Sequence, residues 1–272
     1  MTSLSPIFRA LLREATLTKQ MLGAGATYIY KANYALHGMY FQAFSSLSIG
    51  LERLGKLCVM LDHAIDNAGA FPDDAYMRKV GHDLVGLYNR SQSIKTNRQL
   101  ILRSLQDLSD PIRFSILEIL SSFAKGDRYA NIDLLSGQTR SKDSMAEWAS
   151  KVDAKLYRDR VTSKRKALVK KTREQSVFLD EYSFVFHAAE GGTPILSHDD
   201  AVLRTLKYEA VAPYRQLYVM QIIRYWVELL CDLEAVARSV MPADDVPFFN
   251  EILGPLANDD AYIRRRKTWA RI

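Results

Sequence analysis

A long run of apolar residues at helical spacing dominates the first quarter of the sequence. Between residues 26 and 67, large apolar side chains recur every three or four positions: Phe41, Phe44, Leu47, Leu51, Leu54, Leu57, Met60 and Leu61. This spacing places one apolar stripe along an α-helix, and such a stripe must pack against other elements. A half-buried strand would instead alternate apolar and polar residues. Only Phe184 to Phe186 forms a short strand-like run.

Further helical patterns fill most of the remaining chain. Residues 4–22 predict a first helix, which Gly23-Ala24-Gly25 interrupts, and a second break is expected near Gly38. The other expected helices cover 74–90, capped by Asp73 or Asp74; 111–124, opened by Asp110-Pro111; 142–180; and 201–240, with a break or kink at Pro213.

Composition agrees with long helices and few turns. Glycine (13) and proline (8) are both scarce in 272 residues, and 48% of the chain is hydrophobic, which allows a large core. We therefore expect an all-α fold, an antiparallel helical bundle with additional long C-terminal helices. The predicted division is a bundle over residues 1–135 and a basic helix with a helical extension over 136–272, with one continuous domain as the alternative.

Positive charge is concentrated in one segment. The chain has a net charge of +6, but residues 151–173 contain ten basic and only two acidic residues, so the rest of the chain sums to −2. A helix with so much charge of one sign favours an anionic partner. The sequence predicts contact with a nucleic acid backbone, in particular through Lys164, Arg165, Lys166, Lys170, Lys171 and Arg173. An acidic protein partner, or simple exposure to solvent, is the alternative.

Membrane association and disulfide chemistry are not indicated. No run of 18 apolar residues occurs, and charged residues interrupt the first apolar stretch, where a signal peptide would lie. Cys58 and Cys231 stand alone in apolar helical patterns, so both are expected to be reduced core residues. We expect a cytoplasmic protein without a membrane partner. We also expect no metal ion and no cofactor.

The densest polar cluster around a histidine runs from Arg78 to Leu84. In a continuous helix Arg78 and His82 would share one face at positions i and i+4, with Asp83 beside them. Such a face can cleave RNA without metal, because a histidine can move protons near neutral pH and an arginine can stabilise the charged phosphorane. The candidate catalytic residues are Arg78, His82 and Asp83, and Asp83 would orient the imidazole of His82. The structural alternative is solvated charges around a capping histidine.

Two stretches carry a resemblance to a known family. Residues 43–57 (AFSSLSIGLERLGKL) and the following Gly81-His82-Asp83-Leu84 resemble the HEPN superfamily (higher eukaryotes and prokaryotes nucleotide-binding) over about residues 28–125. The resemblance implies a helical bundle that dimerises, and in many members a metal-independent ribonuclease of toxin–antitoxin or phage-defence systems. It also implies an antitoxin or other defence component as a protein partner.

The spacing of the catalytic pair leaves alternatives open. Nucleases of this superfamily place four to six residues between the arginine and the histidine, whereas Arg78 and His82 have three between them. A non-catalytic module that binds RNA or a nucleotide, or regulates a partner, is therefore the second hypothesis. A third is an HD-type metal phosphohydrolase built from His63, His82-Asp83 and a later aspartate (Asp107, Asp110 or Asp127). Arg128 and Tyr129 add a candidate contact to an RNA base.

Overall fold

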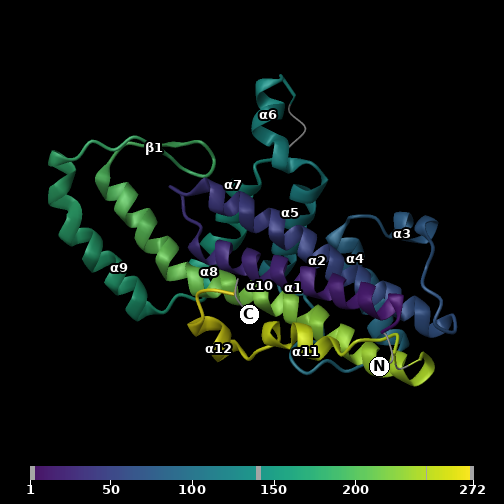
Figure 1. Cartoon of the computed structure of the whole chain (residues 1–272). Coiled ribbons are helices and arrows are strands. Elements are labelled where there is room, and N and C mark those ends of the chain that lie inside the picture. Colours follow the sequence, from purple (N-terminus) through teal and green to yellow (C-terminus); the bar gives the residue numbers. More distant parts are fainter. Residues whose placement is uncertain (1–3, 139–141, 243, 270–272) are drawn as a thin grey trace.

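The computed structural model describes residues 4–138, 142–242 and 244–269, and this part of the chain is predominantly helical (Figure 1). The predicted all-α class is confirmed. The helices are α1 (Pro6–Lys31), α2 (His37–Asp66), α3 (Asp74–Val80), α4 (Leu84–Asn97), α5 (Pro111–Lys125), η1 (Asp127–Tyr129), α6 (Ala130–Leu135), α7 (Ser144–Trp148), η2 (Ala149–Asp153), α8 (Ala154–Asp159), α9 (Ser163–Ser176), η3 (Val177–Tyr182), α10 (His198–Val240), α11 (Phe249–Leu253), η4 (Gly254–Leu256) and α12 (Asp260–Arg265).

Three long helices form the centre of the molecule. Helices α1 and α2 pack along each other, and α10 packs against both. The predicted stripe of α2 supplies much of this core, since Phe44, Leu47, Leu51, Leu54, Leu57 and Leu61 are all buried, although Phe41 is half exposed. One apolar cluster extends from Leu11 to Trp269 and so includes residues from both predicted domains. The division at residue 135 remains a prediction.

The expected break in the first helix is wrong. Helix α1 continues through Gly23-Ala24-Gly25 to Lys31, and the chain turns between Ala32 and Leu36, close to the break expected near Gly38. A Cβ atom on Gly25 would lie 2.6 Å from Leu47 Cγ, and one on Gly50 would lie 2.8 Å from Leu22 Cδ2. These glycines therefore permit close approach of α1 and α2 and do not end a helix.

Two other predicted helices are divided. The expected helix 74–90 is wrong, because α3 ends at Val80, Gly81 adopts a positive φ of 69°, and Asp83 caps a new helix, α4. The expected helix 142–180 is likewise interrupted, and it includes a π-helical turn, η2. The break expected at Pro213 is absent, because α10 runs through this residue without interruption. Helix α5 begins at Pro111 with Asp110 as its cap, as predicted.

A short antiparallel hairpin precedes α10. Strand β1 (His187–Ala188) pairs with β2 (Pro194–Ile195), with His187 opposite Ile195 and Ala188 opposite Pro194. The predicted strand-like run Phe184–Phe186 lies immediately before β1. Buried Ile195 and Ala189 pack on Tyr34, next to the turn between α1 and α2, and thus attach the hairpin to the central helices.

A buried polar cluster joins four parts of the chain. Arg215 of α10, only 1% exposed, donates from Nη1 to Asp153 Oδ2 at 2.9 Å and to the Tyr40 hydroxyl at 3.1 Å. Its Nη2 donates to the carbonyl oxygens of Tyr30 and Ala32 at the end of α1. Asp153 lies at the end of the π-turn η2, so the irregular backbone there presents the carboxylate to the core.

Candidate functional site

The predicted catalytic pair lies at the surface but not on one helix face. Arg78 belongs to α3 and its Nη2 pairs with Asp74 Oδ2 at 2.5 Å, whereas His82 lies in the turn between α3 and α4. The expected i,i+4 arrangement is wrong because Gly81, in a left-handed conformation, ends the helix between them.

The partner of His82 is a residue that the sequence analysis did not single out. His82 Nδ1 lies 2.8 Å from Glu52 Oε1 of α2, and Lys56 Nζ donates to the same oxygen at 2.8 Å. The His82 side chain is 74% exposed. A carboxylate that fixes an accessible imidazole is an arrangement used in general acid–base chemistry. Glu52 precedes His82 by 30 residues, so no local pattern links them.

Asp83 caps a helix instead of orienting the imidazole. Its Oδ1 accepts from the backbone N–H of Val85 at 3.1 Å and from the Ser121 hydroxyl at 2.8 Å, and its Oδ2 lies 3.0 Å from Lys125 Nζ. Although partial burial acts in the opposite direction, the hydrogen bonds from Ser121 and Lys125 lower the pKa of Asp83. The predicted role of Asp83 is therefore corrected to fixing the start of α4 on α5.

The metal-hydrolase alternative finds no assembled ligand set. Within residues 4–138, 142–242 and 244–269, no group of three or more His, Cys, Asp and Glu side chains is placed to hold a metal ion. His63 instead has its Nδ1 3.1 Å from the carbonyl oxygen of Ala70, and its ring packs edge-to-face on Tyr76.

No helix in the described part of the chain is long and apolar enough to cross a bilayer.

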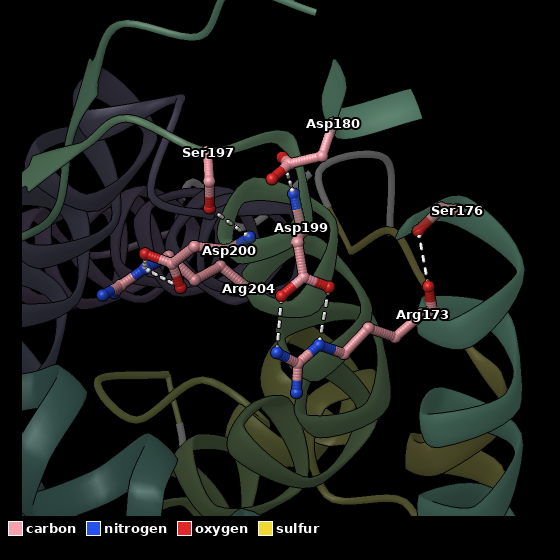
Figure 2. A network of polar contacts seen from close by, with 7 residues as sticks. All are labelled: Arg173, Ser176, Asp180, Ser197, Asp199, Asp200 and Arg204. Carbon is pink, nitrogen blue, oxygen red and sulfur yellow. Dashed lines mark hydrogen bonds and ion pairs between the residues drawn. The ribbon is translucent and has the colours of Figure 1, made fainter. Parts of the chain in front are cut away.

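The predicted basic segment, residues 151–173, is divided among η2, α8 and α9, and α9 is attached to the start of α10 (Figure 2). Arg173 Nε donates to Asp199 Oδ1 at 2.7 Å, and the guanidinium makes a second hydrogen bond to Oδ2. These hydrogen bonds lower the pKa of Asp199. The backbone N–H of Asp199 in turn donates to Asp180 at 3.1 Å. Arg173 therefore holds α9 against α10, a structural role that the sequence analysis did not assign to it.

Most other cations of α9 have only weak ionic partners. Lys164 and Lys171 are exposed and make no ion pair among the described residues, and Lys170 lies 3.8 Å from Glu174. Arg165 Nη2 lies 3.9 Å from Glu209. Lys166 donates to the carbonyl oxygen of Arg158 at 2.8 Å and lies over a tyrosine ring. Solvent-exposed pairs at these distances bind weakly, so phosphate groups can compete for these cations.

A groove beside α9 brings the basic segment together with a second basic run near the end of the sequence, Arg264-Arg265-Arg266-Lys267. It has a volume of about 640 Å³, and its walls come from α1, α9, α10 and α12. Three guanidinium groups line it, from Arg165, Arg264 and Arg265, against the single carboxylate of Glu209. Tyr30 and Tyr214 are the aromatic lining residues, and Arg264 lies 5.3 Å from the Tyr214 ring centre. Arg264 and Arg165 are about one hundred positions apart, so folding alone brings these charges together.

Exposed aromatic side chains follow the basic helix directly. Residues 177–186 include Phe178, Tyr182, Phe184 and Phe186, all strongly exposed, with Phe184 at 94%. None of these four side chains packs in the apolar core. Single-stranded nucleic acids stack their bases on exposed aromatic rings of this kind. We call α9, the groove residues and these four aromatics the basic–aromatic surface.

The remaining predicted residues lie elsewhere on the molecule. Arg128 and Tyr129 are exposed in η1, with the guanidinium 4.9 Å from the ring centre, beside the protruding α6 and apart from α9 (Figure 1). Helices α9 and α3 lie at opposite ends of the molecule (Figure 1). Within a single chain, α9 and His82 therefore do not form one site.

Comparisons with known proteins identify no family for this chain. No family model matches the chain, and neither a curated protein nor a solved structure matches it. The HEPN resemblance thus gains no support from these comparisons.

Proposed function

We propose that this protein binds single-stranded RNA through the basic–aromatic surface. The observation that carries the proposal is the groove in which Arg165 meets Arg264 and Arg265, at the start of a helix, α9, that carries exposed lysines and leads at its other end into the exposed aromatic residues. Proteins that bind single strands combine a positively charged groove along the backbone with aromatic side chains that stack bases. This arrangement supports the non-catalytic binding hypothesis more directly than the nuclease hypothesis. The expected homodimer and the expected protein partner remain predictions.

Removing two exposed charges from α9 tests the surface. We expect the double variant Lys164→Gln, Lys171→Gln to bind single-stranded RNA about tenfold more weakly, and its salt slope to fall by roughly 1.4, the value for two phosphate contacts. Fluorescence anisotropy over a series of salt concentrations measures both quantities. Phe184→Ser should weaken binding without changing the salt slope, because stacking releases no counterions.

A matched control separates a local surface from net charge. Lys79 and Arg90 are also exposed and have no ion pair among the described residues, but neither belongs to this surface. The double variant Lys79→Gln, Arg90→Gln should therefore bind RNA like the wild type. Equal losses in both double variants would show unspecific attraction, and unchanged affinity in both would refute the proposal. A DNA strand of the same sequence reports whether the 2′-hydroxyl contributes.

The Glu52–His82 pair supports RNA cleavage as a second candidate function. The exposed imidazole is held by a carboxylate, and Arg78 lies on the preceding short helix. Incubation of the wild type and His82→Ala with total RNA in EDTA tests it, and Glu52→Gln serves as a milder variant. If the wild type cleaves RNA and His82→Ala does not, the result supports a nuclease. If the RNA stays intact with the wild type, cleavage is refuted and only the binding proposal remains.

A further inference from the structure

A second cavity lies beside α10, away from the basic groove. It has a volume of about 420 Å³ and is enclosed by η2, α8, the tip of the hairpin and the first half of α10. It shares no lining residue with the basic groove. No local sequence pattern predicts this cavity, because its walls come from three separate segments of the chain.

A buried carboxyl group without a full set of partners lines this cavity. Glu190 is only 6% exposed, and no described residue hydrogen-bonds to its Oε1. Arg204 Nη1 lies 3.8 Å from Oε2, beyond hydrogen-bond distance, because Arg204 directs its Nε to both carboxylate oxygens of Asp200 at 3.2 Å. Burial raises the pKa of Glu190. A buried acceptor of this kind gains most from a donor that a ligand supplies.

A cation stands at the exposed side of the same cavity. Lys207 follows Arg204 by three positions, about one helical turn or 5 Å along α10. Its ammonium group lies 5.6 Å from the Tyr157 ring centre and pairs with no described carboxylate. Leu203 and Val211, one turn before and after Lys207, add apolar walls. The cavity thus offers a buried acceptor, a cation on α10 three positions beyond Arg204, and apolar surface.

Other occupants fit these walls less well. Asp153 also lines the cavity, but Arg215, Tyr40 and Trp148 already hydrogen-bond to its carboxylate. The Tyr157 ring has Lys166 and Lys207 each 5.6 Å from its centre, which leaves it poorly placed to stack a planar ligand. No group of potential metal ligands is assembled in the described part of the chain.

We propose that this cavity binds a small zwitterion, an α-amino acid with an apolar side chain. Its ammonium group donates to Glu190, its carboxylate pairs with Lys207, and its side chain lies against Leu203 and Val211. The proposal is independent of RNA binding, since the two surfaces have separate residues.

Calorimetric titration and thermal unfolding with leucine, valine and phenylalanine test this site. We expect at least one of them to bind and to raise the unfolding midpoint. Leucine amide lacks the carboxylate and N-acetyl-leucine lacks the ammonium group, so each should bind about tenfold more weakly than leucine. Glu190→Gln and Lys207→Met should each weaken leucine binding by a similar factor. The controls Glu209→Gln and Lys164→Gln, outside the cavity, should bind like the wild type.

Several outcomes would overturn the proposal. These are no binding by any of the three amino acids, leucine amide binding as well as leucine, or a folded Glu190→Gln variant that keeps wild-type affinity. Glutamine preserves the size of the side chain, so circular dichroism can establish that this variant is folded before the titration. RNA affinity should not change in Glu190→Gln, which keeps this result separate from the test of the basic–aromatic surface.

Discussion

Replacing Arg215 with methionine is expected to lower the free energy of unfolding by about 3–5 kcal/mol. Arg215 is the fully buried cation that neutralises Asp153, and it also donates to two carbonyl oxygens at the end of α1. Methionine fills a similar volume but removes the cation beside Asp153, whose pKa burial already raises. The carboxyl must then take up a proton or stay charged inside the core, and either state costs stability. Urea denaturation followed by circular dichroism measures the loss.

The surface pair Arg158–Asp159 provides the control. Arg158 makes two hydrogen bonds to Asp159, but both side chains are largely in solvent. Arg158→Met should therefore leave the unfolding midpoint unchanged, because exposed pairs are screened by water and salt. The double variant Arg215→Met, Asp153→Leu should recover part of the lost stability by removing the stranded charge. Equal stability of Arg215→Met and the wild type would contradict the assigned role of this cluster.

Replacing Gly25 with alanine is expected to destabilise the protein by about 1–3 kcal/mol, although alanine favours helices. The added Cβ would meet Leu47 Cγ at 2.6 Å, where α1 and α2 are closely packed. The two helices must then separate, or Leu47 must leave its rotamer, and either change disturbs the buried core. Thermal unfolding monitored by circular dichroism gives the sign directly.

Gly38 is the matched helical glycine without a neighbour. A Cβ on Gly38 would have no atom within 4 Å, and the residue lies exposed in the first turn of α2. Gly38→Ala should therefore leave stability unchanged or raise it by up to about 1 kcal/mol. Opposite signs for the two substitutions would confirm that packing, and not helix propensity, requires Gly25. A stabilising Gly25→Ala would refute the close approach of α1 and α2.

Local patterns predicted the helices well and their ends poorly. The stripe from Phe44 to Leu61 identified α2, because helical periodicity depends on neighbours three and four positions away. The same local rules ended a helix at Gly25 and continued one through Gly81, and both predictions were wrong. In the structure a Cβ at position 25 would collide with Leu47, a residue 22 positions later, so glycine is needed there. Gly81 instead adopts the positive φ that ends α3. Only contacts between distant segments distinguish them.

The candidate sites show the same division. By itself the sequence determined the all-α class, the apolar core of α2 and the concentration of charge in residues 151–173, since each depends on residue type and short spacing. Only the tertiary structure shows that Glu52 contacts His82 and that Arg173 hydrogen-bonds to Asp199. It also places Arg264 and Arg165 in one groove. Glu190 became a buried carboxyl only when the hairpin packed beside α10. A side chain acquires partners and burial from residues far along the chain, and its chemistry follows from them.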